Sequence, residues 1–273
     1  MTQTNIAFIG SGNMATSLIS GLINKGQNPA TIWASDPSEV CRSKTAALGV
    51  NVSEDNNEIA HNADVIVIAV KPQALKQVAL PLKALLEGTN KVVISIAAGV
   101  DLTSLQAWLG DSIAIVRCMP NTPSLLGLGA TGLYGNGNTT TAQKELASSI
   151  LNAVGVSVWV NDEAALDAVT AVSGSGPAYY FLLMEAMQEV GIKMGLDAQT
   201  SKLLTLQTAL GAAQMALDSD VEVDELRRRV TSPAGTTEQA VNTFEAGGLR
   251  ELVEKAMNNC AKRARAMAKE LGE

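Results

Sequence analysis

Residues 5–15 constrain the fold of this chain more than any other stretch. They read N-I-A-F-I-G-S-G-N-M-A, so an apolar run typical of a buried strand leads through two glycines into the apolar periodicity of a helix. The spacing is that of a G-x-G-x-x-A turn, in which Gly10 allows the tight turn, Gly12 admits a pyrophosphate and Ala15 lets the helix pack on the strand. We therefore predict a dinucleotide site, with the phosphates at the helix N-terminus. A plain glycine-rich turn between strand and helix is the alternative.

Strand-like runs alternate with helical patterns from the N-terminus to about residue 161. The run D-V-I-V-I-A-V at 64–70 has no polar alternation, which is typical of a strand buried on both faces of a parallel sheet. The alternation predicts an α/β fold with a doubly wound, mostly parallel sheet of the Rossmann type, and one of its helices is expected at 75–86. The predicted strands cover residues 6–9, 31–34, 49–52, 64–70, 91–97, 113–118, 130–134 and 156–159.

The strand pattern stops after about residue 161, and the rest of the chain is predicted to be helical. We therefore expect a dinucleotide-binding domain over residues 1–161 and an all-helical dimerisation and substrate domain over residues 162–273. The helices predicted at 178–194 and 197–217 are apolar nearly all round, and a segment this short cannot easily bury both by itself. We predict that a second subunit covers them in a homodimer; packing of the first domain on them is the alternative. The other helices predicted here cover 162–172, 223–230 and 249–271.

The composition argues against several classes of function. Hydrophobic residues make up 47% of the chain and the net charge is −7, so we expect a large core and no basic surface for nucleic acid. No apolar run is long enough to span a membrane, and the N-terminus lacks the basic region of a signal peptide. The cysteines, Cys41, Cys118 and Cys260, are widely spaced and fit a reduced, cytoplasmic protein, and we expect no metal site. His61 is the single histidine, which argues against a Ser-His-Asp triad and favours an exposed position.

The turn after the second predicted strand reads Ser35-Asp36-Pro37-Ser38, at the place where a Rossmann fold contacts the adenosine ribose. An acidic residue there favours the free 2′-hydroxyl of NAD, and a hydroxyl beside an arginine favours the 2′-phosphate of NADP. This chain offers Asp36 for the first, and Ser35, Ser38 and Arg42 for the second. A solvated turn in which Ser38 caps a helix is a further interpretation. The loop therefore leaves the choice of dinucleotide open.

Three more loops follow predicted strands at the carboxyl edge of the sheet, where open α/β sheets bind ligands. Lys71 and Pro72 end one strand, and Lys71 would face either a phosphate, the ribose or solvent. The small residues 97–99 (A-A-G) would let a flat ring approach the backbone. Residues 119–123 (M-P-N-T-P) form a loop that two prolines make rigid, and Asn121 would hydrogen-bond either a ligand or its own turn.

Near the C-terminus, residues 231–240 read T-S-P-A-G-T-T-E-Q-A and open a predicted helix. Thr236 and Gln239 match a capping box. The N–H groups of the loop before it, together with the helix N-terminus, would bind a carboxylate, and Thr237 would add a hydroxyl. An ordinary helix cap is the alternative interpretation. The basic run at 227–229 (R-R-R) is predicted to be a solvated helix face.

Six segments of the chain together resemble the pyrroline-5-carboxylate reductase family, and the resemblance covers essentially the whole chain. The first is shared with many dinucleotide enzymes, whereas the last two, in this order, are specific to the family. The resemblance implies reduction of Δ1-pyrroline-5-carboxylate to L-proline, the last step of proline biosynthesis, by hydride from NADP(H), with NAD(H) left open. It also implies interlocked helical domains in a homodimer, often assembled into a decamer. The segments are G-S-G-N-M-A (10–15), A-V-K-P (69–72), A-A-G (97–99), M-P-N-T-P (119–123), S-G-S-G-P-A-Y (173–179) and S-P-A-G-T-T (232–237).

The resemblance further implies roles for single residues. Thr237 would donate to the imine nitrogen as the catalytic residue, and residues 173–177 would close on the nicotinamide side. Glu163 falls where some members carry an acid on the substrate side. Arg229 falls where some members carry an asparagine that reaches the partner's cofactor, and Ala234 replaces a glycine. The implied substrate-binding residues are Glu163, Ser232, Ala234, Gly235, Thr236 and Thr237, and the implied cofactor-binding residues are Gly10, Ser11, Gly12, Asn13, Met14, Ser35, Pro37, Asn56, Ala69, Val70, Lys71, Pro72, Ala97, Ala98 and Gly99.

Two other functions stay open at this point. A β-hydroxyacid dehydrogenase shares the layout of the two domains, but that class carries a G-x-x-x-K-x-x-x-N helix whose lysine is the general acid/base. Here the helix after Pro177 has no lysine before Lys193 and carries Tyr179, Tyr180 and Glu185 instead. A non-catalytic NADP-binding dimer that acts as a sensor would bind the dinucleotide without oxidising it. Hydride transfer to an imine needs positioning and a proton source rather than a strong nucleophile, which favours the reductase.

Overall fold

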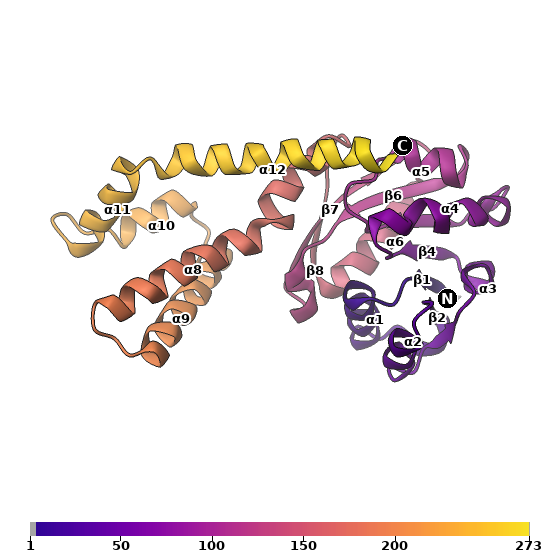
Figure 1. Ribbon diagram of the computed structural model, residues 1–273, viewed down its shortest axis with the longest axis horizontal. Coiled ribbons are helices and arrows are strands. Elements are labelled where there is room, and N and C mark those ends of the chain that lie inside the picture. The colour runs from indigo at the N-terminus through magenta and orange to yellow at the C-terminus, as the bar shows by residue number, and fades with distance from the viewer. Residues whose placement is uncertain (1–3, 273) are drawn as a thin grey trace. The chain divides into compact units, whose positions relative to one another are not determined.

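The computed structural model describes residues 4–272 and divides into two compact units (Figure 1). Among the described residues, the sheet unit comprises 4–175 and 259–272, and the helical unit comprises Gly176–Asn258. The predicted fold class is confirmed, because a mostly parallel sheet occupies the first part of the chain and helices follow it. The predicted boundary between residues 161 and 162 separates two functional domains and stays a prediction. The two compact units are divided elsewhere, after Ser175 and before Asn259.

Within residues 4–272 the sheet has eight strands: β1 (Ile6–Ile9), β2 (Ile32–Ser35), β3 (Asn51–Ser53), β4 (Val65–Ile68), β5 (Val92–Ser95), β6 (Ala114–Met119), β7 (Gly129–Gly135) and β8 (Gly155–Trp159). Their order is β3-β2-β1-β4-β5-β6-β7-β8, and every neighbouring pair is parallel except β6 and β7. The chain runs outward from β1 to β3 and then crosses to β4 on the other side of β1. β1 and β4 therefore flank a topological switch point, which is where open α/β sheets bind ligands.

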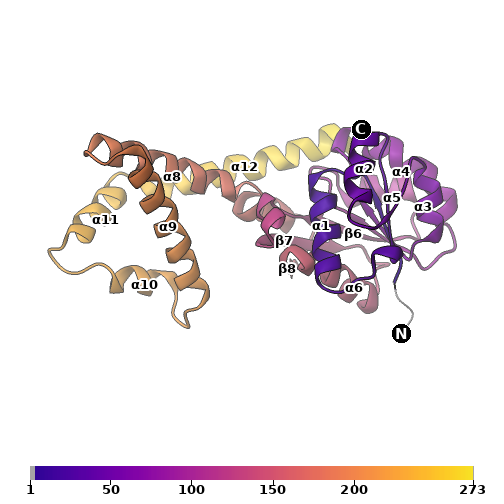
Figure 2. The same ribbon diagram turned by 90° about the horizontal axis from the view of Figure 1, so that it is seen from below.

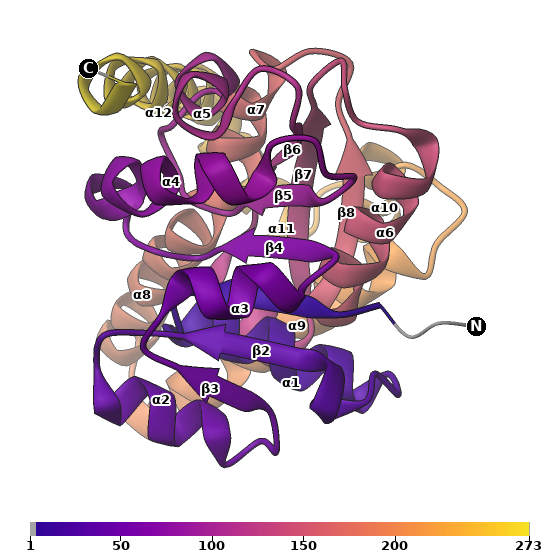
Figure 3. The same ribbon diagram turned by 90° about the vertical axis from the view of Figure 1, so that its right-hand side faces the viewer.

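The helices that precede the helical unit are α1 (Asn13–Asn24), α2 (Glu39–Ala46), α3 (Asn56–Asn62), α4 (Pro72–Leu86), α5 (Leu102–Leu109), α6 (Thr141–Leu151) and α7 (Ala165–Val169), with short 3-10 turns η1 (Pro29–Thr31), η2 (Thr122–Leu126) and η3 (Asn152–Val154) and a π-helix η4 (Thr170–Gly174). Figure 3 shows α3, α4 and α5 along one face of the sheet, and α1 and α6 pack against the other. The central strands β1, β4 and β5 are thus covered on both sides, as their continuous apolar runs require.

Two helices begin about three residues away from their predicted starts, and the other predicted helix ends differ by two residues or fewer or lie in 3-10 turns. α4 begins at Pro72, earlier than the predicted residue 75, because a proline without an N–H fits the first turn of a helix. The helix predicted at 162–172 begins only at Ala165, because the side chain of Asp162 accepts the N–H of Ala165 at 2.8 Å and forms a turn. It then continues as the π-helix η4 up to Gly174.

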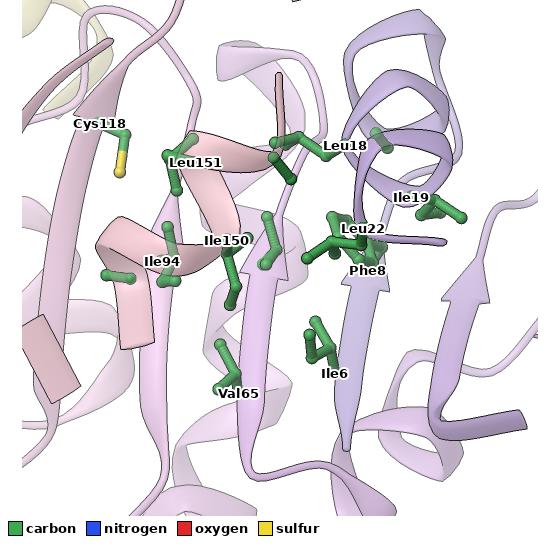
Figure 4. Packing of buried hydrophobic residues seen from close by; sticks show 14 of the residues in the cluster. Ile6, Phe8, Leu18, Ile19, Leu22, Val65, Ile94, Cys118, Ile150 and Leu151 are labelled. Atoms are coloured by element: carbon green, nitrogen blue, oxygen red, sulfur yellow. The ribbon is translucent and has the colours of Figure 1, made fainter. Parts of the chain in front are cut away.

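Each face of the sheet has its own apolar core. Side chains of a strand alternate between the faces, so Ile6 and Phe8 of β1 join one core while Ala7 and Ile9 join the other. Figure 4 shows the first core, in which side chains of α1 and α6 meet those of β1, β4, β5 and β6. Phe8 is completely buried there. These cores hold β1 and β4 rigidly and so fix the positions of the loops at their carboxyl ends.

The last helix, α12 (Leu249–Gly272), belongs to the sheet unit from Asn259 onward. Ala261 is buried, and Leu271 packs against the core that α4 and α5 cover. Polar contacts fasten the same stretch, since Cys260 Sγ lies 3.2 Å from Ser175 Oγ and Arg265 Nε lies 3.3 Å from Asp167 Oδ2. The C-terminal turns of α12 are therefore part of the sheet unit's packing.

The helical unit contains α8 (Gly176–Lys193), α9 (Ala198–Leu217), α10 (Val223–Arg229), α11 (Thr236–Ala246) and the start of α12 (Figure 2). α8 pairs with α9, but large apolar side chains of both remain exposed in the single chain. Phe181 and Leu182 on α8 are 64% and 67% exposed, and Leu203 on α9 is 65% exposed. The two helices thus present the all-round apolar surface that the sequence predicts. No helix within residues 4–272 is long and apolar enough to cross a membrane.

Candidate active site

The predicted phosphate turn lies between β1 and α1, at the topological switch point. Gly10 has φ +98°, and its N–H donates to the carbonyl of Ser35 at 2.8 Å. A Cβ at Gly10 would lie 2.7 Å from the carbonyl oxygen of Ala69 at the end of β4, so the fold itself demands glycine here. Gly12 differs, because a Cβ there would meet nothing within 4 Å. The space over Gly12 is open to a ligand.

The N-terminus of α1 has donors for an anion. Gly12 is the N-cap residue and makes no side-chain cap, so the first N–H groups of the helix have no partner inside it. The predicted residue Asn13 is exposed in this first turn, whereas Met14 packs partly into the core and Ser11 is buried. The open space over Gly12 and these donors fit the pyrophosphate of a dinucleotide.

A cavity of about 450 Å³ lies beside the phosphate turn and gathers several predicted cofactor residues. Ser35 is buried at the end of β2, and its hydroxyl donates to Oδ1 of Asn56, the first residue of α3, at 2.6 Å. The cavity therefore lies where the adenosine half of a dinucleotide would bind. It is lined by Ile9, Gly10, Ser35, Pro37, Glu54, Asp55, Asn56, Asn57, Val70, Ala74, Gln77, Val78 and Pro81.

The ends of β4 and β5 supply the other predicted cofactor residues. Ala69 continues β4 through an N–H bond to the carbonyl of Ile9 at 2.8 Å, and Lys71 is the exposed N-cap of α4. Ala97 is buried and Ala98 is half-buried. Gly99 has φ +74°, and a Cβ there would lie 3.1 Å from Cδ1 of Leu271. Gly99 therefore makes room for α12. The sequence did not reveal this reason for the glycine, because Gly99 and α12 are far apart in the chain.

Asn121 ties together two of the motif loops. Its side chain is buried, its Nδ2 donates to the carbonyl of Ser173 at 3.0 Å, and its Oδ1 accepts the N–H of Ala130 at 2.9 Å. The predicted alternative, a hydrogen bond of Asn121 to its own turn, is not what the structure shows. Its side chain instead links the 119–123 loop to Ser173 and to Ala130 of β7. The sequence shows no link between these loops, because the hydrogen bonds join residues distant in the chain.

Glu163 is held in a cluster of charged groups. Its Oε1 accepts the N–H of Leu102 at 2.7 Å and pairs with Nη1 of Arg117 on β6 at 2.7 Å. Burial raises the pKa of the neighbouring Asp167 and Glu163 adds to this, while Arg117 and Arg265 oppose it. Arg117 was not among the predicted residues, although a single arginine in the otherwise apolar run 113–118 was a signal for it.

The loop before α11 differs from the sequence prediction in one respect. Gly235 is the N-cap and makes no side-chain cap, so Thr236 is the first helical residue and the predicted capping box of Thr236 and Gln239 is wrong. Instead Oε2 of Glu238 accepts the N–H of Ala234 at 2.8 Å, and the N–H of Gly235 donates to the carbonyl of Ser232 at 3.0 Å. The N–H groups of Thr236 and the following residue are left at an uncapped helix N-terminus.

Ala234 has φ +57°, and it is the only residue other than glycine with a positive φ within residues 4–272. The left-handed region is unfavourable for a residue with a Cβ, which explains physically why a glycine suits this position. The strained residue lies in the middle of the predicted carboxylate loop, held by Glu238.

Replacing Ala234 by glycine is expected to stabilise the protein by roughly 0.5–1 kcal/mol, because relief of the left-handed strain exceeds the entropy that glycine adds to the unfolded chain. The free energy of unfolding, from a denaturant titration, measures this. Ala240→Gly, on an exposed position inside α11, is the matched control and is expected to destabilise by about 1 kcal/mol. Equal destabilisation by both variants would contradict the prediction.

The basic run on α10 is a solvated, ion-paired helix face, as predicted. Nε of Arg229 donates to Glu225 at 2.8 Å, and Arg228 pairs with the same carboxylate. Hydrogen bonds from Arg228 and Arg229 hold the pKa of Glu225 below its usual value. His61 is exposed, as the sequence predicts. In the described part of the chain, no three or more His, Cys, Asp or Glu side chains form a group that could hold a metal ion.

The predicted site residues therefore form two groups. The cofactor residues and Glu163 lie in the sheet unit, around the carboxyl ends of β1, β2, β4 and β5. Residues 232–237 lie in the helical unit, in the loop that opens α11. The first group has the geometry of a dinucleotide site, and the second offers donors and a hydroxyl to a small anion.

Comparison with known proteins covers both units. A family model described as pyrroline-5-carboxylate reductase dimerisation matches residues 163–267, and one described as NADP oxidoreductase, coenzyme F420-dependent, matches residues 5–99. A pyrroline-5-carboxylate reductase of Pseudomonas aeruginosa is 54% identical, with 100% of both chains covered. The solved structure of a pyrroline-5-carboxylate reductase from Coxiella burnetii is 47% identical with a TM-score of 0.95, over 98% of this chain and 99% of that one. A Plasmodium falciparum pyrroline carboxylate reductase, solved with NADP bound, is 32% identical with a TM-score of 0.86, over 98% and 99%.

Proposed function

The chain belongs to the pyrroline-5-carboxylate reductase family, and from this premise we propose how its residues share the reduction of Δ1-pyrroline-5-carboxylate to L-proline. The protein is an NAD(P)H-dependent oxidoreductase of proline biosynthesis. The reaction adds a hydride to the imine carbon and a proton to the imine nitrogen, so the C=N double bond becomes a CH–NH single bond. The observation that carries the assignment of roles is the uncapped N-terminus of α11 with Thr237 in its first turn.

The cofactor is NADP(H), with NAD(H) left open by the family relation. When bound, the reduced dinucleotide supplies the hydride. Residues 10–14 hold the pyrophosphate, because the open space over Gly12 and the donors of α1 suit it. Ser35, Pro37 and Asn56 contact the adenosine half. The nicotinamide half lies against Ala69, Val70, Lys71, Pro72, Ala97, Ala98 and Gly99.

The substrate carboxylate binds to the N–H groups that the helix leaves unpaired. Thr236 and Thr237 supply them, since the N–H groups of Ala234 and Gly235 already donate within the loop. In this position the carboxylate orients the ring, and the hydroxyl of Thr237 donates to the imine nitrogen. Ser232, Ala234 and Gly235 shape the loop. We place Glu163 on the substrate side as well, where its pairing with Arg117 holds it.

The protein forms a homodimer through its helical segment, and the exposed apolar side chains of α8 and α9 support this. A second copy of the chain would cover them, because soluble proteins seldom leave such a surface in water. We propose residues 1–161 as the cofactor domain and residues 162–273 as the dimerisation and substrate domain. We also propose that the dimers assemble into a decamer and that the protein is cytoplasmic. The cysteines Cys41, Cys118 and Cys260 are free, which is consistent with a reducing compartment.

The two other functions are less well supported. In a β-hydroxyacid dehydrogenase the helix after the substrate loop would carry the catalytic lysine, whereas α8 has only Lys193, its last residue. A sensor that binds NADP without chemistry would need no donor loop of the kind found before α11.

The decisive experiment is NADPH oxidation by the purified protein, followed at 340 nm with Δ1-pyrroline-5-carboxylate present and absent. We expect oxidation that depends on the substrate, with L-proline as the product by chromatography. Binding of NADPH without oxidation would support a sensor. If NADPH were oxidised in the presence of the oxo form of a β-hydroxyacid but not in the presence of pyrroline-5-carboxylate, the result would support the β-hydroxyacid dehydrogenase.

A further inference from the structure

The last turns of α12 lie against the loop that follows β5. Gly99 in this loop has φ +74°, and a Cβ there would lie 3.1 Å from Cδ1 of Leu271 and 3.3 Å from Cβ of Met267. Leu271 is half-buried and packs against the core that α4 and α5 cover. The end of the helix also reaches α5, since a Cβ at Gly272 would lie 2.6 Å from Oγ of Ser104. Met267 and Leu271 therefore fill the space next to the backbone of this loop.

The same stretch of α12 contacts a second motif loop. Cys260 Sγ lies 3.2 Å from Oγ of Ser175, which belongs to the 173–177 segment. Arg265 Nε lies 3.3 Å from Oδ2 of Asp167 on α7, the helix that leads into this segment. The C-terminal turns of α12 thus contact two loops that are far apart in the sequence.

The residue pattern of this stretch is that of a helix packed on one side. Buried or half-buried residues recur at spacings of three or four, namely Ala261, Ala264, Ala268 and Leu271. The small side chains on this face let the helix approach the sheet unit closely. The opposite face carries exposed charges such as Arg263. The packed face therefore fixes this stretch to the sheet unit.

The loop at Gly99 follows β5, where the reactive half of the cofactor is proposed to lie. The adenosine and phosphate contacts proposed above are at the ends of β2 and β1, so the dinucleotide continues over the carboxyl ends of β4 and β5. The rate of hydride transfer depends steeply on how the ring is placed, since a displacement of about 1 Å costs roughly a hundredfold. Side chains that fix this loop can therefore control turnover through the loop alone.

We propose that Met267 and Leu271 are positioning residues for hydride transfer, which hold the 97–99 loop in place against the nicotinamide. Both act through the backbone of the loop at Gly99, so the C-terminal turns of α12 are a supporting part of the active site. The inference rests on the proposed function in placing the nicotinamide against this loop.

Leu271→Ala in the full-length protein tests this proposal, with Leu85→Ala as the matched control. Leu85 is also half-buried against the same core, but it lies in the last turn of α4, before the chain enters β5. We expect Leu271→Ala to lower kcat about tenfold, to raise the dissociation constant of NADPH about threefold, and to speed amide hydrogen exchange of residues 97–99 in the cofactor-free protein. Leu85→Ala is expected to lower the free energy of unfolding by a similar amount and to leave these three quantities unchanged within about twofold.

Two further variants show whether the side chains act by filling the space beside Gly99. Leu271→Met keeps most of the volume and is expected to restore kcat to within about twofold of the original. Met267→Ala keeps its Cβ, loses the Cε that lies 3.6 Å from a Cβ at Gly99, and is expected to lower kcat about threefold.

The proposal is overturned if Leu271→Ala and Leu85→Ala give the same kcat, NADPH constant and exchange rates, or if Leu271→Met loses as much turnover as Leu271→Ala. The unaltered protein is assayed first. If it binds NADPH but never reduces pyrroline-5-carboxylate, the proposed function fails, and the binding and exchange measurements still decide this inference.

Discussion

Replacing Thr237 with alanine is expected to lower kcat about a hundredfold while the melting temperature stays within a degree or so of the original. The side chain is exposed in the first turn of α11, so its loss leaves no cavity in a core. The hydroxyl is the group proposed to donate to the imine nitrogen, where basicity develops as the hydride arrives. Steady-state kinetics with saturating NADPH and a thermal melt provide the two measurements.

Two variants test whether the effect belongs to the Thr237 hydroxyl. Thr237→Ser keeps a hydroxyl at this position and is expected to recover most of the turnover. Thr236→Ala removes the same atoms from the adjacent, equally exposed residue of the same turn and is expected to change kcat by less than about threefold. An unchanged kcat in Thr237→Ala would leave Thr237 as an ordinary helix residue and remove it from the mechanism.

Alanine substitutions at Gly10 and Gly12 are expected to change different properties, namely the stability of the protein at Gly10 and its affinity for the cofactor at Gly12. Gly10→Ala places a Cβ 2.7 Å from the carbonyl oxygen of Ala69 at φ +98°, and we expect a loss of stability of about 2–4 kcal/mol. Gly12→Ala meets nothing within 4 Å in the protein and should leave stability unchanged. Because the methyl group occupies the space proposed for the pyrophosphate, we expect Gly12→Ala to weaken NADPH binding by about tenfold or more.

A third glycine isolates the cause of the Gly10 effect. Gly26 has φ +94°, but a Cβ there would meet nothing within 4 Å. Gly26→Ala therefore reports the backbone strain alone, about 1–2 kcal/mol, and the difference from Gly10→Ala measures the clash with β4. Denaturant titrations of the three variants, with cofactor titrations for Gly12→Ala, give the comparison. If Gly12→Ala binds NADPH as the original protein does, the pyrophosphate does not lie over Gly12.

Much of the fold follows from local patterns in the chain. Runs such as 64–70 specify buried strands, because a parallel strand with both faces covered needs apolar side chains throughout. The turn at 10–15 specifies its own geometry, since glycine tolerates the positive φ that the turn adopts at Gly10. The apolar surface of α8 and α9 likewise needed no tertiary information, because no arrangement of one short segment buries a helix on all sides.

Helix ends were harder to predict, because the competing caps differ by small energies. The pair Thr236 and Gln239 matched a capping box, but the chain places Gly235 at the N-cap and uses Glu238 on the N–H of Ala234. A shift of one residue changes which side chain reaches which N–H. This shift also decides which backbone donors remain for a substrate.

The sequence alone determined the alternating sheet, the place of the dinucleotide turn and the helices that need a second subunit, because each depends on neighbours in the chain. Tertiary structure alone decided that Asn121 joins two motif loops, that Gly99 makes room for α12, and that Glu54 pairs with Arg42 beside the ribose loop. These contacts join segments far apart in sequence, and their hydrogen bonds exist only after the cores on both faces of the sheet have brought the segments together.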